Sequence, residues 1–167
     1  MLAPSQAALI FAAVAADREH LREWLPWVDH TERVEDTRIF LEMQLNSQRQ
    51  DAAYGFGIWQ DERLRGIAGI HDINTADRNA KIGYWLSREA EGRGLMTRAV
   101  RALLGVCFNA LSLERVEILV ATGNHRSAAI PERLGFTLEG VTRHAQWLNG
   151  RFVDLRLYSL LRDEFRL

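Results

Sequence analysis

One stretch of the sequence constrains the fold more than any other, because a strand pattern, a glycine loop, a helix pattern and a second strand pattern follow one another. The first strand pattern is Lys81–Leu86, and the loop holds Gly92-Arg93-Gly94. The helix runs from about Leu95 to Leu111, and the apolar strand is Val116–Ala121. Strands joined through a helix pair in parallel, with a right-handed crossover. We therefore expect a central pair of parallel strands.

Helices and hairpins surround this unit. Residues 4–23 are expected to form one helix. A second helix is expected from about Asp29, because Asp29 and Glu32 have the spacing of a capping box. Residues 124–134 should form a short helix. Segments rich in aromatic and β-branched residues, with hairpin turns at 61–62 and 149–150, predict further strands over Tyr54–Trp59, Arg65–Ile73, Thr137–Trp147 and Phe152–Leu160. The 167 residues are expected to form a single α/β (α+β) domain, residues 1–167, with a mixed, mostly antiparallel sheet flanked by helices.

Composition argues against several classes of function. The chain has 21 basic and 22 acidic residues and no basic stripe, so we expect no nucleic-acid partner. The apolar run Ala7–Ala16 is too short to span a bilayer, and we expect no membrane partner. Cys107 is the single cysteine, which fits a reducing, cytoplasmic setting. The five histidines show no zinc spacing, so no metal is expected.

The Gly92-Arg93-Gly94 loop is a candidate phosphate site. The first turn of a helix has amide groups without partners inside the helix, the helix dipole adds positive charge, and glycine lets a ligand approach the backbone. A Walker loop would need Lys and Ser or Thr after the last glycine, and a dinucleotide site would need a small residue where Thr97 stands. Because both patterns fail, a nucleotide-binding α/β module is disfavoured.

Further marks along the chain resemble one family. They are His20-Leu21-Arg22-Glu23-Trp24-Leu25-Pro26-Trp27, Asn79-Ala80-Lys81-Ile82-Gly83-Tyr84-Trp85-Leu86, Gly92-Arg93-Gly94-Leu95-Met96-Thr97, Asn124-His125-Arg126-Ser127, Leu134-Gly135-Phe136 and Glu139-Gly140. In this order they resemble the GNAT superfamily of N-acetyltransferases. Within it, they resemble the branch that acetylates the N-terminal alanine or serine of ribosomal proteins. The resemblance extends from about Ala7 to Phe165.

This resemblance implies an acetyl-CoA site where the two central parallel strands splay apart. The pantetheine arm would meet main-chain groups of Tyr84, Trp85 and Leu86 and the side chain of Asn124. The thiol would lie near Ser127, which is therefore both a cofactor-binding and a catalytic candidate. The pyrophosphate would bind the backbone of the loop and of the helix start, formed by Gly92, Arg93, Gly94, Leu95, Met96 and Thr97.

The chain departs from the family in two places. Glu91 stands where the family usually has Gln or Arg, and it puts a negative charge beside a negative ligand. The affinity for acetyl-CoA should fall if Glu91 points inward and should be kept if Glu91 points to solvent. Family members also begin with a strand ahead of the first helix. This sequence starts inside that helix, so the strand is expected to be missing or truncated, with a sheet edge left unpaired.

The catalytic groups of the family are not obvious here. This branch often has an acidic residue where Asn74 stands, and many members of the superfamily have an acid tyrosine where Pro131 stands. Asn74 remains a catalytic candidate by its position but cannot act as a base. The nearby alternatives are His71, Asp72 and Asp77, and histidine is suited to proton transfer near neutral pH. Strand alternation places His71 and Asp72 on opposite faces.

The acceptor is predicted from this missing base. An α-amine has a pKa near ~8 and a lysine amine near ~10.4, so far more of the α-amine is neutral at pH 7. We therefore expect transfer to a protein N-terminus or a small amine, with Trp27, Asn74 and Trp147 as acceptor-binding candidates. A catalytically weak acyl-CoA-binding protein is the alternative. A homodimer is compatible with the sequence, which leaves the oligomeric state open.

Overall fold

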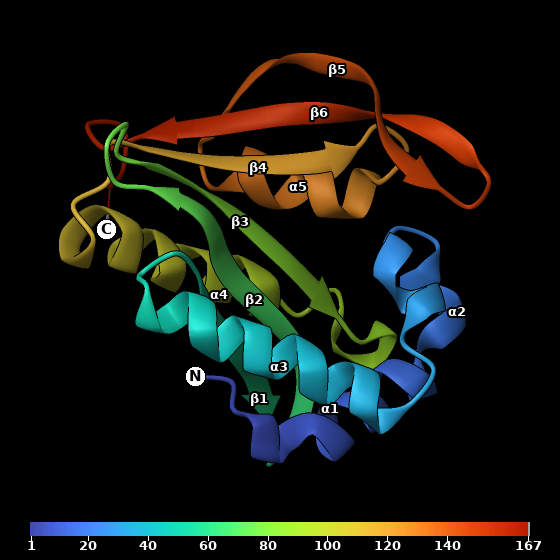
Figure 1. Ribbon diagram of the computed structural model, residues 1–167. Helices are drawn as coiled ribbons and strands as arrows, with labels where there is room; N and C mark the ends of the chain where they lie inside the picture. Colours follow the sequence, from blue (N-terminus) through green and yellow to red (C-terminus); the bar gives the residue numbers. More distant parts are fainter. Residues whose placement is uncertain (167) are drawn as a thin grey trace.

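The computed structural model describes residues 1–166 and contains one six-stranded sheet (Figure 1). Its strand order is β1-β2-β3-β4-β6-β5; β3 and β4 are parallel and all other neighbours are antiparallel. The strands are β1 (Tyr54–Gln60), β2 (Arg63–Asn74), β3 (Asn79–Leu86), β4 (Arg115–Ala121), β5 (Thr137–Leu148) and β6 (Arg151–Leu161). The expected mixed sheet with a parallel pair is confirmed.

Helices cover both faces of this sheet, because the strands bury apolar side chains on both sides. On one face, α1 (Ala7–Ala16) and α3 (Val34–Arg49) pack over β1 and β2 around Ile10, Leu41 and Leu64. On the other face, α4 (Leu95–Gly105) and α5 (His125–Arg133) cover a larger core. Figure 1 shows α3 in front of the sheet and α4 behind it.

The N-terminal helical region is more broken than the sequence predicted. The single helix expected over residues 4–23 is interrupted at Asp17. The Asp17 side chain accepts a hydrogen bond from the Arg88 backbone N–H at 2.9 Å, outside the helix. Such side-chain bonds compete with helical geometry. The observed elements are the short 3-10 turn η1 (Pro4–Gln6), α1, α2 (Arg18–Arg22) and a second 3-10 turn, η2 (Pro26–His30).

The next helix also begins later than predicted, at Val34 rather than near Asp29. The side chain of Asp36 explains this, because its Oδ2 accepts hydrogen bonds from the backbone N–H of Glu32 at 3.0 Å and of Arg33 at 2.8 Å. These contacts cap the helix one turn further along the chain. The Asp29 carboxylate is instead paired with an arginine of α2 at 3.1 Å.

The helix after the glycine loop changes form near its end. α4 ends at Gly105 and is followed by a π-helical turn, η4 (Val106–Ala110), instead of continuing as α-helix to Leu111. Cys107 lies in this turn and is fully buried. Burial raises the pKa of its thiol to about 12, which keeps it protonated and unreactive.

The outer edge of β1 is only partly covered. No strand precedes η1 within residues 1–166, as expected. The backbone N–H of Leu2 donates to the Gly55 carbonyl at 3.0 Å, and the Leu2 side chain packs where a β-carbon of Gly55 would stand. A single backbone hydrogen bond therefore takes the place of a strand pairing at this edge.

Candidate active site

The two central strands pair only at their beginnings. The parallel register contains three pairs and ends at Lys81 opposite Glu117. Beyond this point β3 continues to Leu86 and β4 to Ala121 without pairing, while β4 stays bonded to β6. The splay implied by the resemblance is therefore present. Beyond Lys81, the edge of β3 that faces β4 therefore has no strand partner.

A cleft of about 950 Å³ occupies the wide end of this splay. The ends of β3 and α2, the loop before α4, the first two turns of α4 and the length of α5 line it. Of the predicted cofactor-binding residues, those that line it are Tyr84, Trp85, Leu86, Gly92, Gly94, Leu95, Met96, Thr97, Asn124 and Ser127. Arg93 is not part of the lining; its carbonyl oxygen accepts a hydrogen bond from Arg98 at 3.2 Å.

The glycine loop has the conformation that its sequence requires. Gly92 has φ +73° and Gly94 φ +70°, a region that side chains rarely enter. Gly94 is the N-cap of α4, so the amides that follow it have no partner within the helix and open onto the cleft. The loop is thus built to receive an anion.

Glu91 points inward rather than to solvent. Its Oε1 lies 3.0 Å from Nε2 of His20, its other oxygen pairs with Arg126, and its side chain is 21% exposed. The carboxylate therefore ties α2 to the start of α5 across the mouth of the cleft. Its charge is balanced by Arg126, which lessens the repulsion that we expected for an inward-pointing Glu91.

Asn124, Ser127 and Tyr84 form a small polar cluster inside the cleft. Asn124 caps α5, because its Oδ1 accepts a hydrogen bond from the Ser127 N–H at 3.0 Å. The Tyr84 hydroxyl donates to the Ser127 carbonyl at 3.1 Å and accepts from Ser127 Oγ at 3.2 Å. Burial raises the pKa of Tyr84 to about 12. The adjacent Trp85 points to the opposite face and packs there with α1, α2 and η2.

On that opposite face, His71 lies over the start of the splay. A β-carbon on Gly83 would lie 3.2 Å from Nε2 of His71. Gly83 is two residues beyond Lys81, the last paired residue of β3. His71 Nδ1 is 3.5 Å from Asp72 Oδ2, and Lys81 Nζ donates to the same oxygen at 2.9 Å. That hydrogen bond is the main reason why the pKa of Asp72 is lowered.

The expected alternation of His71 and Asp72 is wrong. Asp72 has φ +52°, and the register between β2 and β3 shifts between His71 and Asn74. The irregularity turns the Asp72 carboxylate toward His71. Asn74 lies farther along, opposite Asn79 at the beginning of β3, and it hydrogen-bonds Asp77 in the turn. The structure does not bring Asn74 to the cleft.

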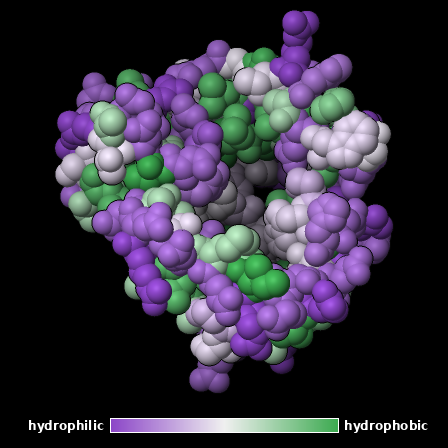
Figure 2. Space-filling model, viewed as in Figure 1, coloured by the Kyte–Doolittle hydropathy of each residue, from purple (hydrophilic) through white to green (hydrophobic). Residues whose placement is uncertain are grey.

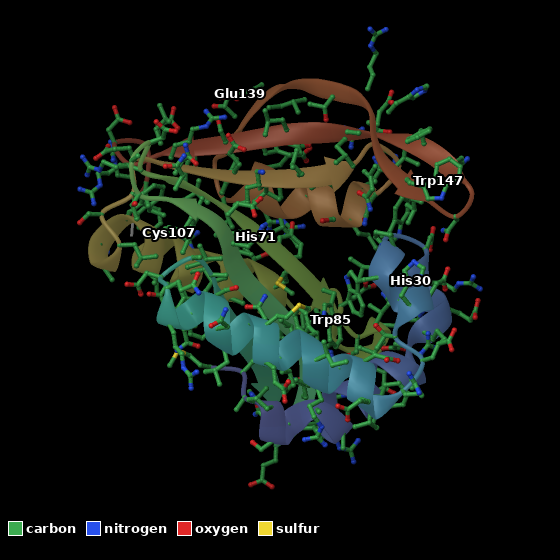
Figure 3. All side chains as sticks on the ribbon, viewed as in Figure 1. His30, His71, Trp85, Cys107, Glu139 and Trp147 are labelled. Atoms are coloured by element: carbon green, nitrogen blue, oxygen red, sulfur yellow. The ribbon has the colours of Figure 1, made fainter. Side chains whose placement is uncertain are left out.

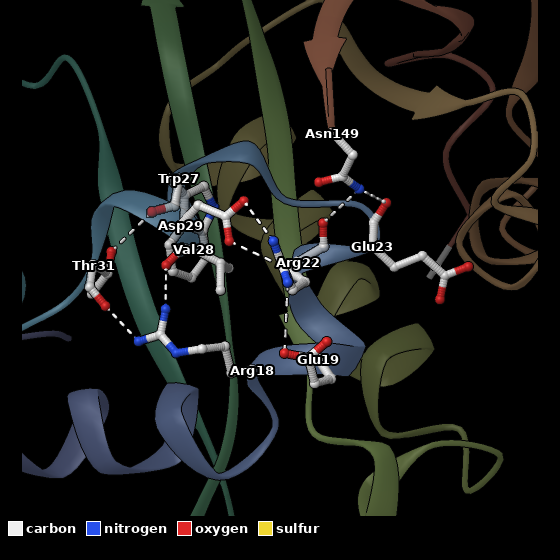
Figure 4. A network of polar contacts seen from close by, with 9 residues as sticks. All are labelled: Arg18, Glu19, Arg22, Glu23, Trp27, Val28, Asp29, Thr31 and Asn149. Atoms are coloured by element: carbon white, nitrogen blue, oxygen red, sulfur yellow. Dashed lines mark hydrogen bonds and ion pairs between the residues drawn. The ribbon is translucent and has the colours of Figure 1, made fainter. Parts of the chain in front are cut away.

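The same face is hollowed between β3 and β4, as Figure 2 shows. Trp147 stands beside this hollow on the β5–β6 hairpin and is 56% exposed; Figure 3 labels it. Trp27, 38% exposed, lies in η2. Asn149 at the hairpin tip donates to the carbonyl of Arg22 at 3.2 Å, one contact of the network in Figure 4. The hairpin therefore touches the end of α2 and encloses the hollow on that side.

Comparison with known proteins identifies the family. Residues 2–137 match the family described as acetyltransferase (GNAT) domain. The chain belongs to the GNAT acetyltransferase family. The expectation of an N-acetyltransferase is confirmed.

Relatives along the whole length support this assignment. YdaF of Bacillus subtilis (strain 168), whose name assigns it provisionally to the ribosomal N-acetyltransferases, is 34% identical over 99% of this chain and 91% of its own. The ribosomal-protein-serine acetyltransferase of Escherichia coli (strain K12) is 27% identical over 92% of this chain and 86% of its own. A structure of RimL, a ribosomal L7/L12 alpha-N-protein acetyltransferase in complex with coenzyme A, has TM-score 0.93 and 25% identity, covering 98% of this chain and 92% of its own.

Sequence reasoning missed several residues that line the cleft of this acetyltransferase. Three arginines and His20 are among them. Arg98 and Arg101 are three apart on α4 and thus share a face, a spacing that would have indicated a basic rim. The guanidinium of Arg133 donates to Thr97 at 3.0 Å. No local sequence pattern predicts this contact, because it depends on α5 bringing Arg133 across the cleft.

Within residues 1–166, no helix has the length and apolar character that crossing a membrane requires. The same residues contain no group of three or more His, Cys, Asp or Glu side chains placed to hold a metal ion.

Proposed function

We propose that the protein transfers the acetyl group of acetyl-CoA to a primary amine, most naturally the α-amine of a polypeptide N-terminus or of a small molecule. One observation carries the proposal: the β3–β4 splay is open on two sides. The anion-binding loop lines the cleft at the wide end of the splay, and a hollow between β3 and β4 lies on the face of the sheet that carries His71. Donor and acceptor can therefore meet in a ternary complex.

The donor would lie along the unpaired part of β3. Backbone amides of the Gly92–Thr97 segment would bind its pyrophosphate, and Arg98, Arg101 and Arg126 add positive charge at the rim. Main-chain groups of Tyr84–Leu86 and the amide of Asn124 would pair with the pantetheine. Support comes from the coenzyme A complex of the RimL structure, which shares this fold.

His71 is the group best placed to take the proton of the amine. Its Nε2 faces the backbone of Gly83, where the splay begins, and Asp72 orients the other ring nitrogen. The amine nitrogen attacks the acetyl carbon, the C–S bond breaks with its electron pair on sulfur, and one amine proton passes to His71. Asn74 has no part in this scheme, because it lies in the turn.

The acceptor enters through the hollow. Trp147 on the β5–β6 hairpin and Trp27 in η2 are exposed aromatic side chains that could contact it, and the contact of Asn149 with α2 restricts the approach. Such an opening suits the end of a chain or a slender amine. The names of relatives that acetylate ribosomal proteins point in the same direction.

The acceptor class is tested with a matched pair of peptides. One has a free N-terminus and no lysine, and the other has a blocked N-terminus and one lysine. CoA release and product mass are measured with acetyl-CoA at pH 7. From the fraction of neutral amine at pKa values of ~8 and ~10.4, the lysine peptide should be poorer in kcat/KM by about 200-fold. Comparable values would contradict the α-amine assignment. Acetyl-CoA binding without turnover on any amine would favour a weak acyl-CoA-binding protein.

The role of His71 is tested in the same assay. His71→Gln should lower kcat by about 100-fold, the usual scale for a general base, and leave the KM for acetyl-CoA unchanged. His30→Gln is the control, because His30 is an exposed histidine of η2 outside the cleft lining. Full activity of His71→Gln would remove His71 from the mechanism.

A further inference from the structure

Two hydroxyl groups meet inside the cleft from opposite sides of the splay. Tyr84 comes from β3 and Ser127 from the first turn of α5. The phenol oxygen is 3.1 Å from the Ser127 carbonyl oxygen and 3.2 Å from Ser127 Oγ. Because burial raises the pKa of Tyr84 to about 12, the phenol keeps its proton at neutral pH and remains a hydrogen-bond donor.

The two hydroxyls can exchange partners without moving their oxygens. In the structure Tyr84 donates to the Ser127 carbonyl and Ser127 donates to Tyr84. A hydroxyl hydrogen rotates to suit its partner. When the Ser127 O–H turns toward a ligand in the cleft, the Tyr84 O–H can turn from the carbonyl to Ser127 Oγ. Hydrogen bonds in such a chain strengthen one another.

We propose that Tyr84 is a positioning residue for acetyl transfer: it holds Ser127 Oγ in the cleft and supports the hydrogen bond that Ser127 donates to the departing sulfur. This inference rests on the proposed function and deepens it. Ser127 is the residue that touches the reacting atoms, and Tyr84 acts through it. The Tyr84 phenol therefore has a part in acetyl transfer beyond the main-chain contacts assigned to β3.

The step balances without a proton from either hydroxyl. The amine nitrogen bonds to the acetyl carbon, the C–S bond breaks, and the electron pair remains on sulfur. The amine proton goes to His71 and then to solvent. Coenzyme A leaves as a thiolate and takes a proton from water. The hydrogen bond from Ser127 strengthens as charge grows on sulfur, so it favours the transition state over bound acetyl-CoA.

The alternative is that the pair only fastens α5 to the sheet, and Tyr158 provides the matched control. It lies on β6, is 1% exposed, and donates its hydroxyl to Glu132 of α5 at 2.8 Å. Tyr158 therefore also ties α5 to the sheet through a phenol, but it does not line the cleft. Removal of either hydroxyl should have a similar effect on the fold.

The experiment is a double-mutant cycle. Tyr84→Phe, Ser127→Ala, the double variant and Tyr158→Phe are compared with the wild type. For each protein we measure kcat, the KM for acetyl-CoA, the Kd for coenzyme A and the Tm. Tyr84→Phe should lower kcat about tenfold, the scale of one hydrogen bond to a charged atom, with the coenzyme A Kd within about twofold of the wild type. The double variant should be no slower than Ser127→Ala alone.

The controls separate the outcomes. Tyr158→Phe should keep the wild-type kcat, and Ser127→Thr, which keeps a hydroxyl, should regain much of the activity lost in Ser127→Ala. Wild-type kcat in Tyr84→Phe overturns the proposal. A double variant whose fold-decrease in kcat equals the product of the two single decreases overturns it as well. A fall in kcat matched by Tyr158→Phe would also overturn it in favour of a structural tie. Absence of turnover in the wild type would refute the proposed function itself.

Discussion

A single methyl group on the glycine loop tests how the cofactor is bound. Gly92 has φ +73°, and a β-carbon placed on it would have no atom within 4 Å. Alanine at this position therefore meets no clash inside the protein. It costs only the left-handed backbone strain, about 1–2 kcal/mol. In a chain of this size that cost lowers the Tm by roughly 2–8 °C.

Gly135 is a matched control for this substitution. Its φ is +82°, a β-carbon there would also have no atom within 4 Å, and it does not line the cleft. Gly92→Ala and Gly135→Ala should therefore lose similar amounts of folding stability. Only Gly92→Ala places a methyl group beside the helix start that we assign to the pyrophosphate.

The two variants should differ in their response to acetyl-CoA. At a ligand concentration of 100 Kd, binding stabilises a protein by about 2.7 kcal/mol. Loss of one hydrogen bond to a charged phosphate, about 1.5 kcal/mol, weakens binding roughly tenfold, and the stabilisation falls to about 1.4 kcal/mol.

Thermal melting with and without acetyl-CoA measures this difference. The cofactor-induced rise in Tm should be nearly halved in Gly92→Ala and kept in Gly135→Ala. Equal rises in the two variants would refute the assignment of the pyrophosphate to this loop.

Two further predictions concern charged groups. Glu91→Gln removes a negative charge near the proposed pyrophosphate site and releases Arg126, so calorimetry should show a Kd for acetyl-CoA lower by about threefold. Weaker binding would mean that the contacts of Glu91 with His20 and Arg126 shape the cleft. The pKa of Glu139 is lowered to about 2, mainly by its hydrogen bond with Arg115, so this carboxylate contributes stability above its ordinary pKa that is lost as pH falls toward 2. Melting curves should show Glu139→Gln less stable than the wild type at pH 7, and this difference in stability should close between about pH 4.5 and pH 2. A difference that stays constant with pH would contradict the titration of the Glu139 carboxylate.

Local features of the sequence determined much of the framework. Positive φ at Gly92 and Gly94, and at both residues of the Asn149-Gly150 turn, follows from residue types that accept that conformation. The parallel pair follows from a strand, a helix and a strand in succession. The Asn124 cap of α5 is likewise a local contact, three residues in length. Structural features that depend on one turn or one element could be predicted, because no contact with a distant part of the chain overrides them.

The start of the second helix was decided by competing local contacts. Asp29 had the expected spacing, but Asp36 forms the cap, while Asp29 bonds an arginine of α2. The chemistry of the acceptor side depended on a register shift. Strand alternation placed Asp72 away from His71, yet its positive φ brings the two together. A bulge depends on how both strands fit the sheet, so the sequence of one strand does not reveal it.

The sequence by itself determined that a glycine loop would open a helix between two parallel strands, because the turn residues, the helix start and the strand order are local. Only the tertiary structure decided which side chains meet across that site. Tyr84 and Ser127, and His20, Glu91 and Arg126, come from separate elements. Their contacts depend on how α2 and α5 pack at the two sides of the splay, and packing of the whole core sets that geometry.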